Sequence, residues 1–269
     1  MSVFVDFADV IDAVERYRQA KRPSLPPEVS EEYGSIAEAV KKTLLREASL
    51  PLMAVQGVPG AGKTTILMNV LPDALDELDA GVKLLYTAPT NALVTETLVR
   101  VMAILRDGGY SYSEIFRMIK VYGSKIPSEP TASRLEIVLK KRGINESATA
   151  LVSLIAKSLY APIDEETKLI LATESQRVSS KSLRESGFRF SAFHDEASRS
   201  PLYHLFVPYM DKLVKGEVDV ISSLVVVGDP FQAISVPQAF IQSRYPLLAV
   251  QAVACAIKNS DHPEQYQQL

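Results

Sequence analysis

The stretch "VQGVPGAGKTT", residues 55–65, decides the fold. Glycine or proline fills four of its eleven positions, and neither residue suits the middle of a helix or a strand. An apolar run precedes the stretch and a segment of helical period follows it. We therefore interpret it as a loop that joins a strand to a helix.

The rest of the chain repeats this alternation of short apolar runs with helical stretches. Such a pattern favours an α/β fold, in which a mostly parallel sheet is covered by helices on both faces. The predicted strands are residues 52–56, 83–88, 168–173, 189–194 and 223–228.

Two parts of the chain depart from the alternation. Residues 1–48 read as a helical N-terminal segment with a linker. In it, a helix over 3–21 is followed by the proline-rich stretch 22–35 and by a second helix over 35–47 with Ser35 as its N-cap. Residues 49–269 form the main domain, and its section from about 100 to 165 looks like a helical insertion between two strands.

Composition narrows the class of protein. A net charge of -3 argues against a uniform basic surface for nucleic acid but permits a local basic track. The runs "RYRQAKR" and "KKRG" are either phosphate contacts or solvated helix faces. The single cysteine, Cys255, excludes an intramolecular disulfide and fits a reducing, intracellular compartment, cytoplasmic or nuclear. No apolar run reaches the length of a membrane span, so we expect no membrane contact.

Residues 57–64 match the phosphate-loop pattern G-x-x-x-x-G-K-[ST] in the context of strand and helix that the pattern requires. Glycines let backbone N–H groups approach phosphates, and the helix N-terminus adds a positive dipole. Lys63 would reach the terminal phosphates, and the Thr64 hydroxyl would bind Mg²⁺. The alternative is a glycine-rich turn without a ligand. We predict that ATP and Mg²⁺ are bound here, by Gly57, Val58, Pro59, Gly60, Ala61, Gly62, Lys63, Thr64 and Thr65.

An acid pair ends the predicted strand in "FRFSAFHDEAS". Asp195 would hold Mg²⁺ through water, and Glu196 would orient and deprotonate the attacking water. The alternative is a solvated acidic turn. His194 either tunes Asp195 or is simply the last residue of the strand.

A third polar group ends the strand in "VVVGDPFQAISV". Asp229 and Gln232 would leave the sheet at the edge where open parallel sheets bind ligands. The Gln232 amide can both donate and accept, so it could sense the γ-phosphate or its attacking water and belongs with Lys63, Asp195 and Glu196 as a candidate catalytic residue. The alternative is an ordinary Gly-Asp-Pro turn.

Taken in order, the segments "GVPGAGKTT", "YTAPTNALV", "LILATESQ", "FHDEAS" and "VVVGDPFQA" resemble the motifs of superfamily 1 helicases. The resemblance covers about residues 50–236 and is closest to the branch with the RNA helicase of nonsense-mediated decay and its DNA-processing relatives. It implies a RecA-like P-loop NTPase, the first motor domain of a helicase, with single-stranded DNA or RNA as partner. It also implies that the strand track is lined by Thr87, Pro89, Thr90, Asn91 and Thr173, although threonine and asparagine are equally good helix caps.

The chain departs from this family in three ways. Arg199 stands where that branch commonly has a glutamine, and no residue before the phosphate loop matches the family's adenine-sensing glutamine. Only 37 residues follow Gln232, too few for a second RecA-like domain. We therefore expect either the front half of a motor, completed by a second RecA-like domain in cis or in a partner chain, or a single-domain switch or assembly ATPase that does not unwind.

Overall fold

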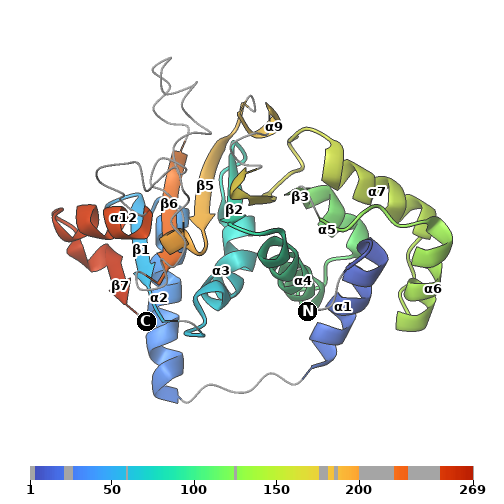
Figure 1. Cartoon of the computed structure of the whole chain (residues 1–269), viewed down its shortest axis with the longest axis horizontal. Helices are drawn as coiled ribbons and strands as arrows, with labels where there is room; N and C mark the ends of the chain where they lie inside the picture. The colour runs from blue at the N-terminus through green and yellow to red at the C-terminus, as the bar shows by residue number, and fades with distance from the viewer. Residues whose placement is uncertain are drawn as a thin grey trace.

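In the part of the chain that the structure describes, seven strands form one sheet in which every neighbouring pair runs parallel (Figure 1). The computed structural model describes residues 4–20, 27–58, 60–123, 126–175, 181–184, 187–199, 221–229 and 249–268. The strand order is β3-β4-β2-β5-β6-β1-β7, and the predicted α/β fold with a parallel sheet is confirmed. The strands are β1 (Leu52–Gln56), β2 (Val82–Ala88), β3 (Ile119–Tyr122), β4 (Leu169–Thr173), β5 (Arg189–His194), β6 (Ile221–Gly228) and β7 (Tyr266–Gln268).

Helices cover both faces of the sheet, and alternate strand residues face the two sides. In β1, Met53 and Val55 join the large core beneath helices α2 (Pro27–Leu44), α3 (Lys63–Glu77) and α4 (Asn91–Asp107). Ala54, between them, joins a smaller core on the other face, beneath α12 (Ala249–Lys258). Because both faces are buried, the central strands are mostly apolar, which makes them recognisable in the sequence.

The segment predicted as a helical insertion contains a strand. Helices α5 (Tyr112–Met118), α6 (Ala132–Arg142) and α7 (Ala148–Tyr160) lie there, but Ile119–Tyr122 form β3 beside β4. The sequence "IKVY" hides this strand because Lys120 is buried with its charge satisfied: its Nζ lies 3.2 Å from both Asp164 Oδ2 and the Lys157 carbonyl oxygen. The extent of the insertion itself stays a prediction.

The N-terminal segment also differs from its prediction. Helix α1 (Phe7–Gln19) begins after the N-cap Asp6, but α2 already begins at Pro27. The linker prediction is therefore wrong over 27–35, and Ser35 lies inside a helix. Proline is tolerated in the first turn of a helix, where its missing N–H has no partner to lose. A domain boundary at residue 48 stays a prediction.

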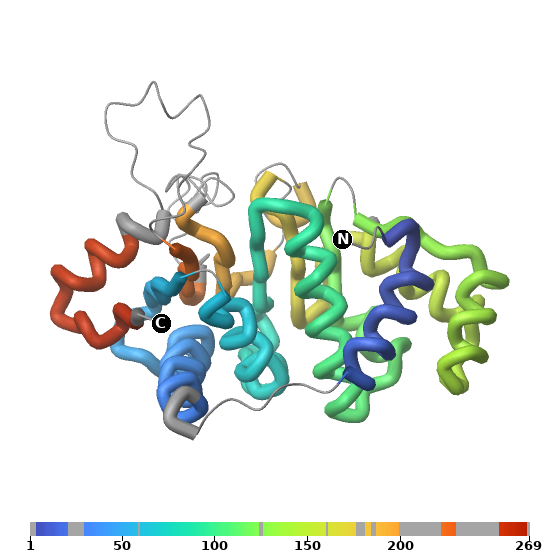
Figure 2. Tube along the Cα trace, turned by 60° about the horizontal axis from the view of Figure 1, so that its bottom comes forward, coloured from blue at the N-terminus to red at the C-terminus, as the bar shows by residue number. Residues whose placement is uncertain are grey.

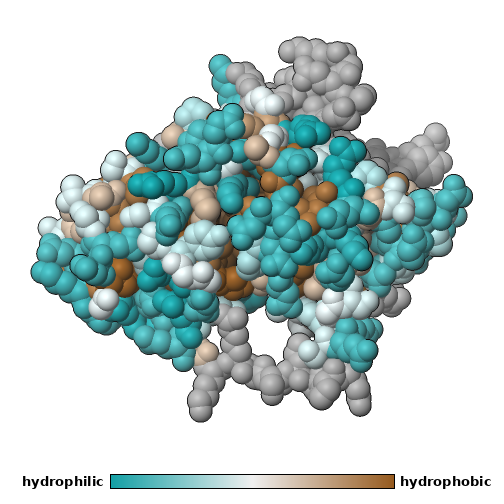
Figure 3. Space-filling model, turned by 180° about the vertical axis from the view of Figure 1, so that it is seen from behind, coloured by the Kyte–Doolittle hydropathy of each residue, from teal (hydrophilic) through white to brown (hydrophobic). Residues whose placement is uncertain are grey.

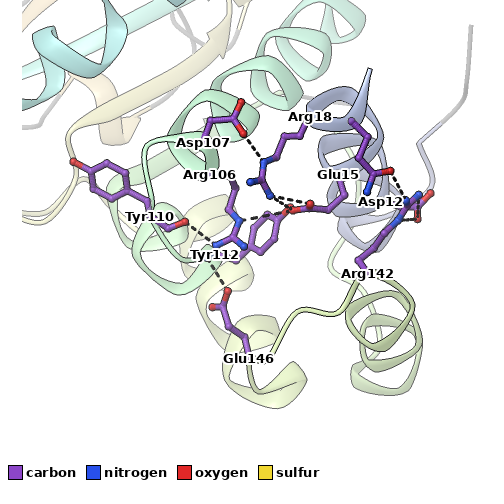
Figure 4. A network of polar contacts seen from close by, with 10 residues as sticks. Asp12, Glu15, Arg18, Arg106, Asp107, Tyr110, Tyr112, Arg142 and Glu146 are labelled. Atoms are coloured by element: carbon purple, nitrogen blue, oxygen red, sulfur yellow. Dashed lines mark hydrogen bonds and ion pairs between the residues drawn. The ribbon is translucent and has the colours of Figure 1, made fainter. Parts of the chain in front are cut away.

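Helices α1 and α2 serve different parts of the fold (Figure 2). Helix α2 packs on α3, beside the centre of the sheet, whereas α1 packs on α4 and α6. Polar contacts fix α1 there (Figure 4). Asp12 Oδ1 lies 2.8 Å from Arg142 and 3.3 Å from Lys141 Nζ. The buried Glu15 accepts from Arg18 at 2.9 Å and from the Tyr112 hydroxyl at 2.8 Å.

These ion pairs account for basic residues that the sequence left open as phosphate contacts. Arg16 and Arg18 of the first basic run contact Asp12 and Glu15, and Lys141 and Arg142 of the second contact Asp12.

Within the described helices, none is long and apolar enough to cross a membrane. On the face seen in Figure 3, hydrophobic residues gather in separate patches between hydrophilic ones.

We expect Asp12→Asn to lower the free energy of unfolding at pH 7 by about 1 kcal/mol, because it removes a charged acceptor from Arg142. The pKa of the Asp12 carboxyl lies below its ordinary 3.8: burial alone would raise it, but hydrogen bonds from Arg142 and Lys141 outweigh burial. A depressed folded pKa contributes stability that is complete above the unfolded pKa and is lost as the pH falls through the folded value.

The difference between wild type and variant should therefore be equal at pH 7 and pH 5 and shrink near pH 3, in urea titrations followed by circular dichroism. Glu136→Gln is the matched control. It breaks an exposed ion pair with Lys140 within α6, the helix that also carries Arg142, and should leave the free energy of unfolding unchanged. A difference that grows on acidification would contradict the assignment.

Candidate active site

The motif residues gather at the carboxyl-terminal edge of the sheet, where open parallel sheets bind ligands. The phosphate loop follows β1, the acid pair follows β5, and Asp229 follows β6. The Gly57 N–H donates to the Gly228 carbonyl oxygen at 3.2 Å, so the ends of β1 and β6 are tied together. Pro59 and Gln232 lie outside the described residues.

The loop has the backbone that its glycines permit. Gly60 and Gly62 both have φ of 78°, a left-handed conformation that favours glycine. Gly62 is the N-cap of α3 and makes no side-chain cap, so the helix N-terminus keeps donors for an anion. Lys63 is buried, with Nζ 2.9 Å from the Gly57 carbonyl oxygen and 3.0 Å from that of Val58. A buried ammonium held by carbonyls beside a helix N-terminus suits a phosphate ligand. The remaining loop residues vary in exposure: Val58, Gly60 and Thr65 are exposed, Ala61 and Thr64 are half-buried, and Gly57 is buried.

Tyr33 of α2 supports the loop from outside the motif. Its hydroxyl contacts the Gly62 carbonyl oxygen and lies 3.3 Å from that of Ala61. A Cβ on Gly62 would collide with this hydroxyl. Burial raises the pKa of Tyr33, so the phenol stays protonated and can donate. Glycine at position 62 is thus favoured by its φ, and the Tyr33 side chain packs directly against it.

A hydrogen bond joins the loop to the acid pair. Thr64 Oγ1 donates to Asp195 Oδ2 at 2.7 Å, and the Tyr86 hydroxyl donates to the same oxygen at 3.0 Å. Thr97 Oγ1 of α4 in turn donates to the Tyr86 hydroxyl at 3.0 Å. Burial, together with the Asp195 charge, raises the pKa of Tyr86 well above its ordinary value. Tyr86 therefore remains a donor that orients the carboxylate.

The donor set fits magnesium with a nucleotide. Thr64 and Asp195 present two hard oxygen ligands side by side, and Mg²⁺ is typically held by one or two protein oxygens together with substrate phosphates and waters. Within the described part of the chain, no group of three or more histidine, cysteine, aspartate or glutamate residues could hold a metal ion by itself. The two oxygens of Thr64 and Asp195 suit a metal that also binds phosphates and waters.

Glu196 occupies a strained turn. Its φ is 54°, in the left-handed region that costs a residue with a Cβ roughly 1 kcal/mol or more. Its N–H donates to Asp195 Oδ1 at 2.9 Å, and its side chain is half-buried. The two carboxylates are thus placed by one tight turn directly after β5. Such strain concentrates at functional sites, which favours a role for Glu196 beyond that of a solvated acid.

The end of β6 packs closely on this turn. A Cβ on Gly228 would lie 2.7 Å from the Ser198 nitrogen and 3.2 Å from the Ala197 nitrogen. Only glycine fits there, so the end of β6 and the turn after β5 form one packed unit. Asp229, the next residue, is buried.

The predicted track residues fall into two groups. The Thr87 and Thr173 side chains are buried, so any effect of these residues on a bound DNA or RNA strand would be indirect. Thr90 is exposed and caps α4 by accepting from the Leu93 N–H at 3.3 Å, which is the helix-cap role left open by the sequence. Pro89 and Asn91 are half-buried beside it.

Sequence reasoning missed Tyr33, Tyr86, Thr97 and Glu174, and it left His194 undecided. His194 is fully buried, contacts Thr87 Oγ1 through Nδ1, and has Nε2 3.1 Å from Glu174 Oε1. One signal was available: polar residues such as Tyr86, Thr87 and His194 stand at the ends of otherwise apolar strands. The partners come from distant segments, so no local pattern reveals them.

Comparison with protein families identifies more than half of the chain. A family model described as an AAA domain matches residues 34–186 of the 269. The match includes the phosphate loop but ends before the acid pair. No curated protein sequence matches the chain.

Two solved structures of the UvsW protein from bacteriophage T4, a helicase, resemble the fold. One has 14% identity and a TM-score of 0.41, covering 72% of this chain and 30% of that chain. The other has 15% identity and a TM-score of 0.39, covering 72% and 52%. This chain therefore spans less than two thirds of the length of either, and both likenesses are too distant to inform on the site.

We expect Glu196→Gly to raise the free energy of unfolding by about 0.5 to 1 kcal/mol, because glycine relieves the left-handed strain and loses part of that gain to its own flexibility. Arg46→Gly is the matched control, since Arg46 is exposed and has a φ of 63° outside the site. Thermal and urea unfolding should show a gain for both. A loss for Glu196→Gly alone would mean that its side-chain contacts outweigh the strain.

Proposed function

The chain belongs to the AAA domain family, and on that premise we propose that it is an ATP-binding and ATP-hydrolysing motor domain of a nucleic-acid helicase or translocase. The observation that carries this proposal is the 2.7 Å hydrogen bond from Thr64 to Asp195. It brings the phosphate loop, inside the matched range, together with an acid pair beyond that range. A passive phosphate-binding turn has no need of an adjacent carboxylate pair in which Glu196 has a strained backbone.

Within the proposal, each site residue has a defined task. Lys63 exchanges its loop carbonyls for the terminal phosphates, and the first turn of α3 donates N–H groups to them. Thr64 and Asp195 hold Mg²⁺, with Tyr86 fixing the rotamer of Asp195. Glu196 orients water and accepts its proton. When bound, Mg·ATP supplies the phosphoryl group whose transfer to water releases the free energy for movement.

The finer assignment follows the order of the motifs. "TAPTN", "LATES", "DEAS" and "GDPFQ" support a RecA-like first motor domain of superfamily 1, in the branch with the nonsense-mediated-decay RNA helicase. Gln232 would sense the γ-phosphate. Single-stranded DNA or RNA would lie across the carboxyl ends of the β-strands. It would contact the exposed Thr90 and the half-buried Pro89 and Asn91 directly, whereas the buried Thr87 and Thr173 would support that surface from below.

The same proposal includes a second RecA-like domain, in cis or on a partner chain. Phosphoryl transfer builds negative charge on the γ-phosphate oxygens, and an arginine from that domain would stabilise it. If hydrolysis by residues 1–269 is raised by single-stranded DNA or RNA, and raised further by the second domain, a motor is favoured. Nucleotide binding without either effect would favour a switch or assembly ATPase.

Lys63→Ala should weaken Mg·ATP binding by about 10- to 100-fold, because a charge-assisted contact to phosphate is lost. Isothermal titration calorimetry measures the affinity, and circular dichroism checks that the fold persists. Lys140→Ala, which removes an exposed lysine of α6, is the control and should bind like wild type. Equal affinity in the Lys63 variant would remove the phosphate loop from the proposal.

Glu196→Gln should retain ATP binding within about threefold and lower the hydrolysis rate by at least about 100-fold, since the amide keeps shape but cannot accept the proton. Single-turnover phosphate release measures the rate. Glu165→Gln changes an exposed carboxylate before β4 and serves as control. Hydrolysis at the wild-type rate in the Glu196 variant would show that the base lies elsewhere.

A further inference from the structure

A buried histidine stands between the acid pair and the two strand ends beside it. His194 is the last residue of β5, and none of its surface is exposed. Its Nδ1 contacts Thr87 Oγ1 at the end of β2, and its Nε2 lies 3.1 Å from Glu174 Oε1, just past the end of β4. One imidazole therefore contacts residues at the ends of β2, the adjacent strand, and of β4, the strand beyond it. These segments carry the motifs "TAPTN" and "LATES".

The two sides of the β5 end have different partners. Successive strand residues point to opposite faces. Asp195 and Tyr86 meet on the side of α3 and α4, where Thr64 and Thr97 complete their network. His194 and Thr87 are paired in register and meet on the other side, towards Glu174. The phosphate site and the His194 contacts are thus separate networks joined through one backbone.

That backbone junction is tight. The Asp195 N–H donates to the Thr87 carbonyl oxygen at 2.8 Å, while the Thr87 hydroxyl contacts His194. Thr87 is held by both residues at once, so a shift at the end of β2 must move Asp195 or break these contacts. The next residue, Ala88, is in register with Thr173, which carries the same movement to Glu174.

An apolar residue at position 194 would endanger the stability of the fold less than histidine does. A buried polar group that loses its hydrogen-bond partners lowers the stability of the protein. Glu174 is not sealed in: 13% of its side chain is exposed, at the edge where Thr90 and Pro89 emerge. The network therefore runs from a partly exposed glutamate side chain, whose Oε1 is itself buried, through a buried imidazole, to the turn that places both candidate catalytic carboxylates.

We propose that His194 is a positioning residue. It links the binding of single-stranded nucleic acid at the ends of β2 and β4, beside Thr87 and Glu174, to the placement of Asp195 and Glu196. The inference rests on the proposed function, since it takes that surface as the place where single-stranded nucleic acid lies. Strand binding that engages Glu174 or its neighbours would set the imidazole and, through it, the acid turn. Nucleotide at the turn would change strand affinity by the same factor, because coupling between two sites is reciprocal.

The test measures coupling, which a merely structural histidine would not control. Wild type, His194→Phe and Glu174→Ala are compared for the affinity of a fluorescent 20-nucleotide strand with and without Mg·ADP, and for hydrolysis with and without that strand. Glu174→Gln is the conservative variant. His262→Phe is the matched control, because His262 forms an exposed pair with Glu264, Nδ1 to Oε1 at 3.3 Å, away from the site.

We expect the nucleotide to change strand affinity by about fivefold or more in wild type and by less than about twofold in His194→Phe and Glu174→Ala. The ratio of strand-stimulated to unstimulated hydrolysis should fall in parallel. Glu174→Gln should recover part of the coupling, and His262→Phe should keep all of it. Full coupling in His194→Phe would overturn the inference and leave the proposed function standing.

Hydrogen exchange of the nucleotide-free proteins separates the two proposals. Glu174→Ala should speed amide exchange in residues 194–198, on the far side of the imidazole, as well as locally. If wild type binds no nucleotide, the proposed function fails, and exchange still decides whether the link exists. Exchange that changes only around residue 174 would overturn the link whatever the nucleotide result.

Discussion

The hydrogen bond between Thr64 and Asp195 is the contact on which the site depends, because it joins two segments that lie 131 positions apart in the chain. The parallel sheet makes it possible: β1 and β5 each pair with β6, so their carboxyl ends open at the same edge. Tyr86 and Thr97 then fix the carboxylate from beneath. The phosphate loop, the acid turn and the end of β6 are consequently joined, and glycine at position 228 is a condition of the packing between the last two.

Much of the sheet could be predicted from the sequence because its central strands are buried on both faces and so are mostly apolar. The strands missed were those that lack this signature. Strand β3 carries a lysine whose charge is satisfied by Asp164 and a carbonyl, and β7 is the polar stretch Tyr266–Gln268. The early start of α2 escaped because prolines were interpreted as breakers, although one of them stands in the first helical turn.

The candidate site was predictable only where its chemistry is local. The glycine spacing of the loop and the adjacency of Asp195 and Glu196 are visible in the sequence. The supports are not, because Tyr33, Tyr86 and Glu174 reach the site from other elements through contacts that no spacing encodes. The same limit applies to Thr87 and Thr173: motif position assigned them to a surface, whereas the strand register buries them. Residue type indicated the chemistry, and topology decided which atoms meet.

The contact of Tyr33 with the Gly62 carbonyl bears on the smallest fragment that could retain the site. The matched family range begins at residue 34, one position after the side chain that buttresses the phosphate loop. A fragment trimmed to that range would keep every motif residue of the loop yet lose the support beneath it. Helix α1 is different, since its main packing partners are α4 and α6. The functional unit therefore begins upstream of Tyr33, within α2, and the recognisable family sequence is shorter than the machinery that shapes its binding loop.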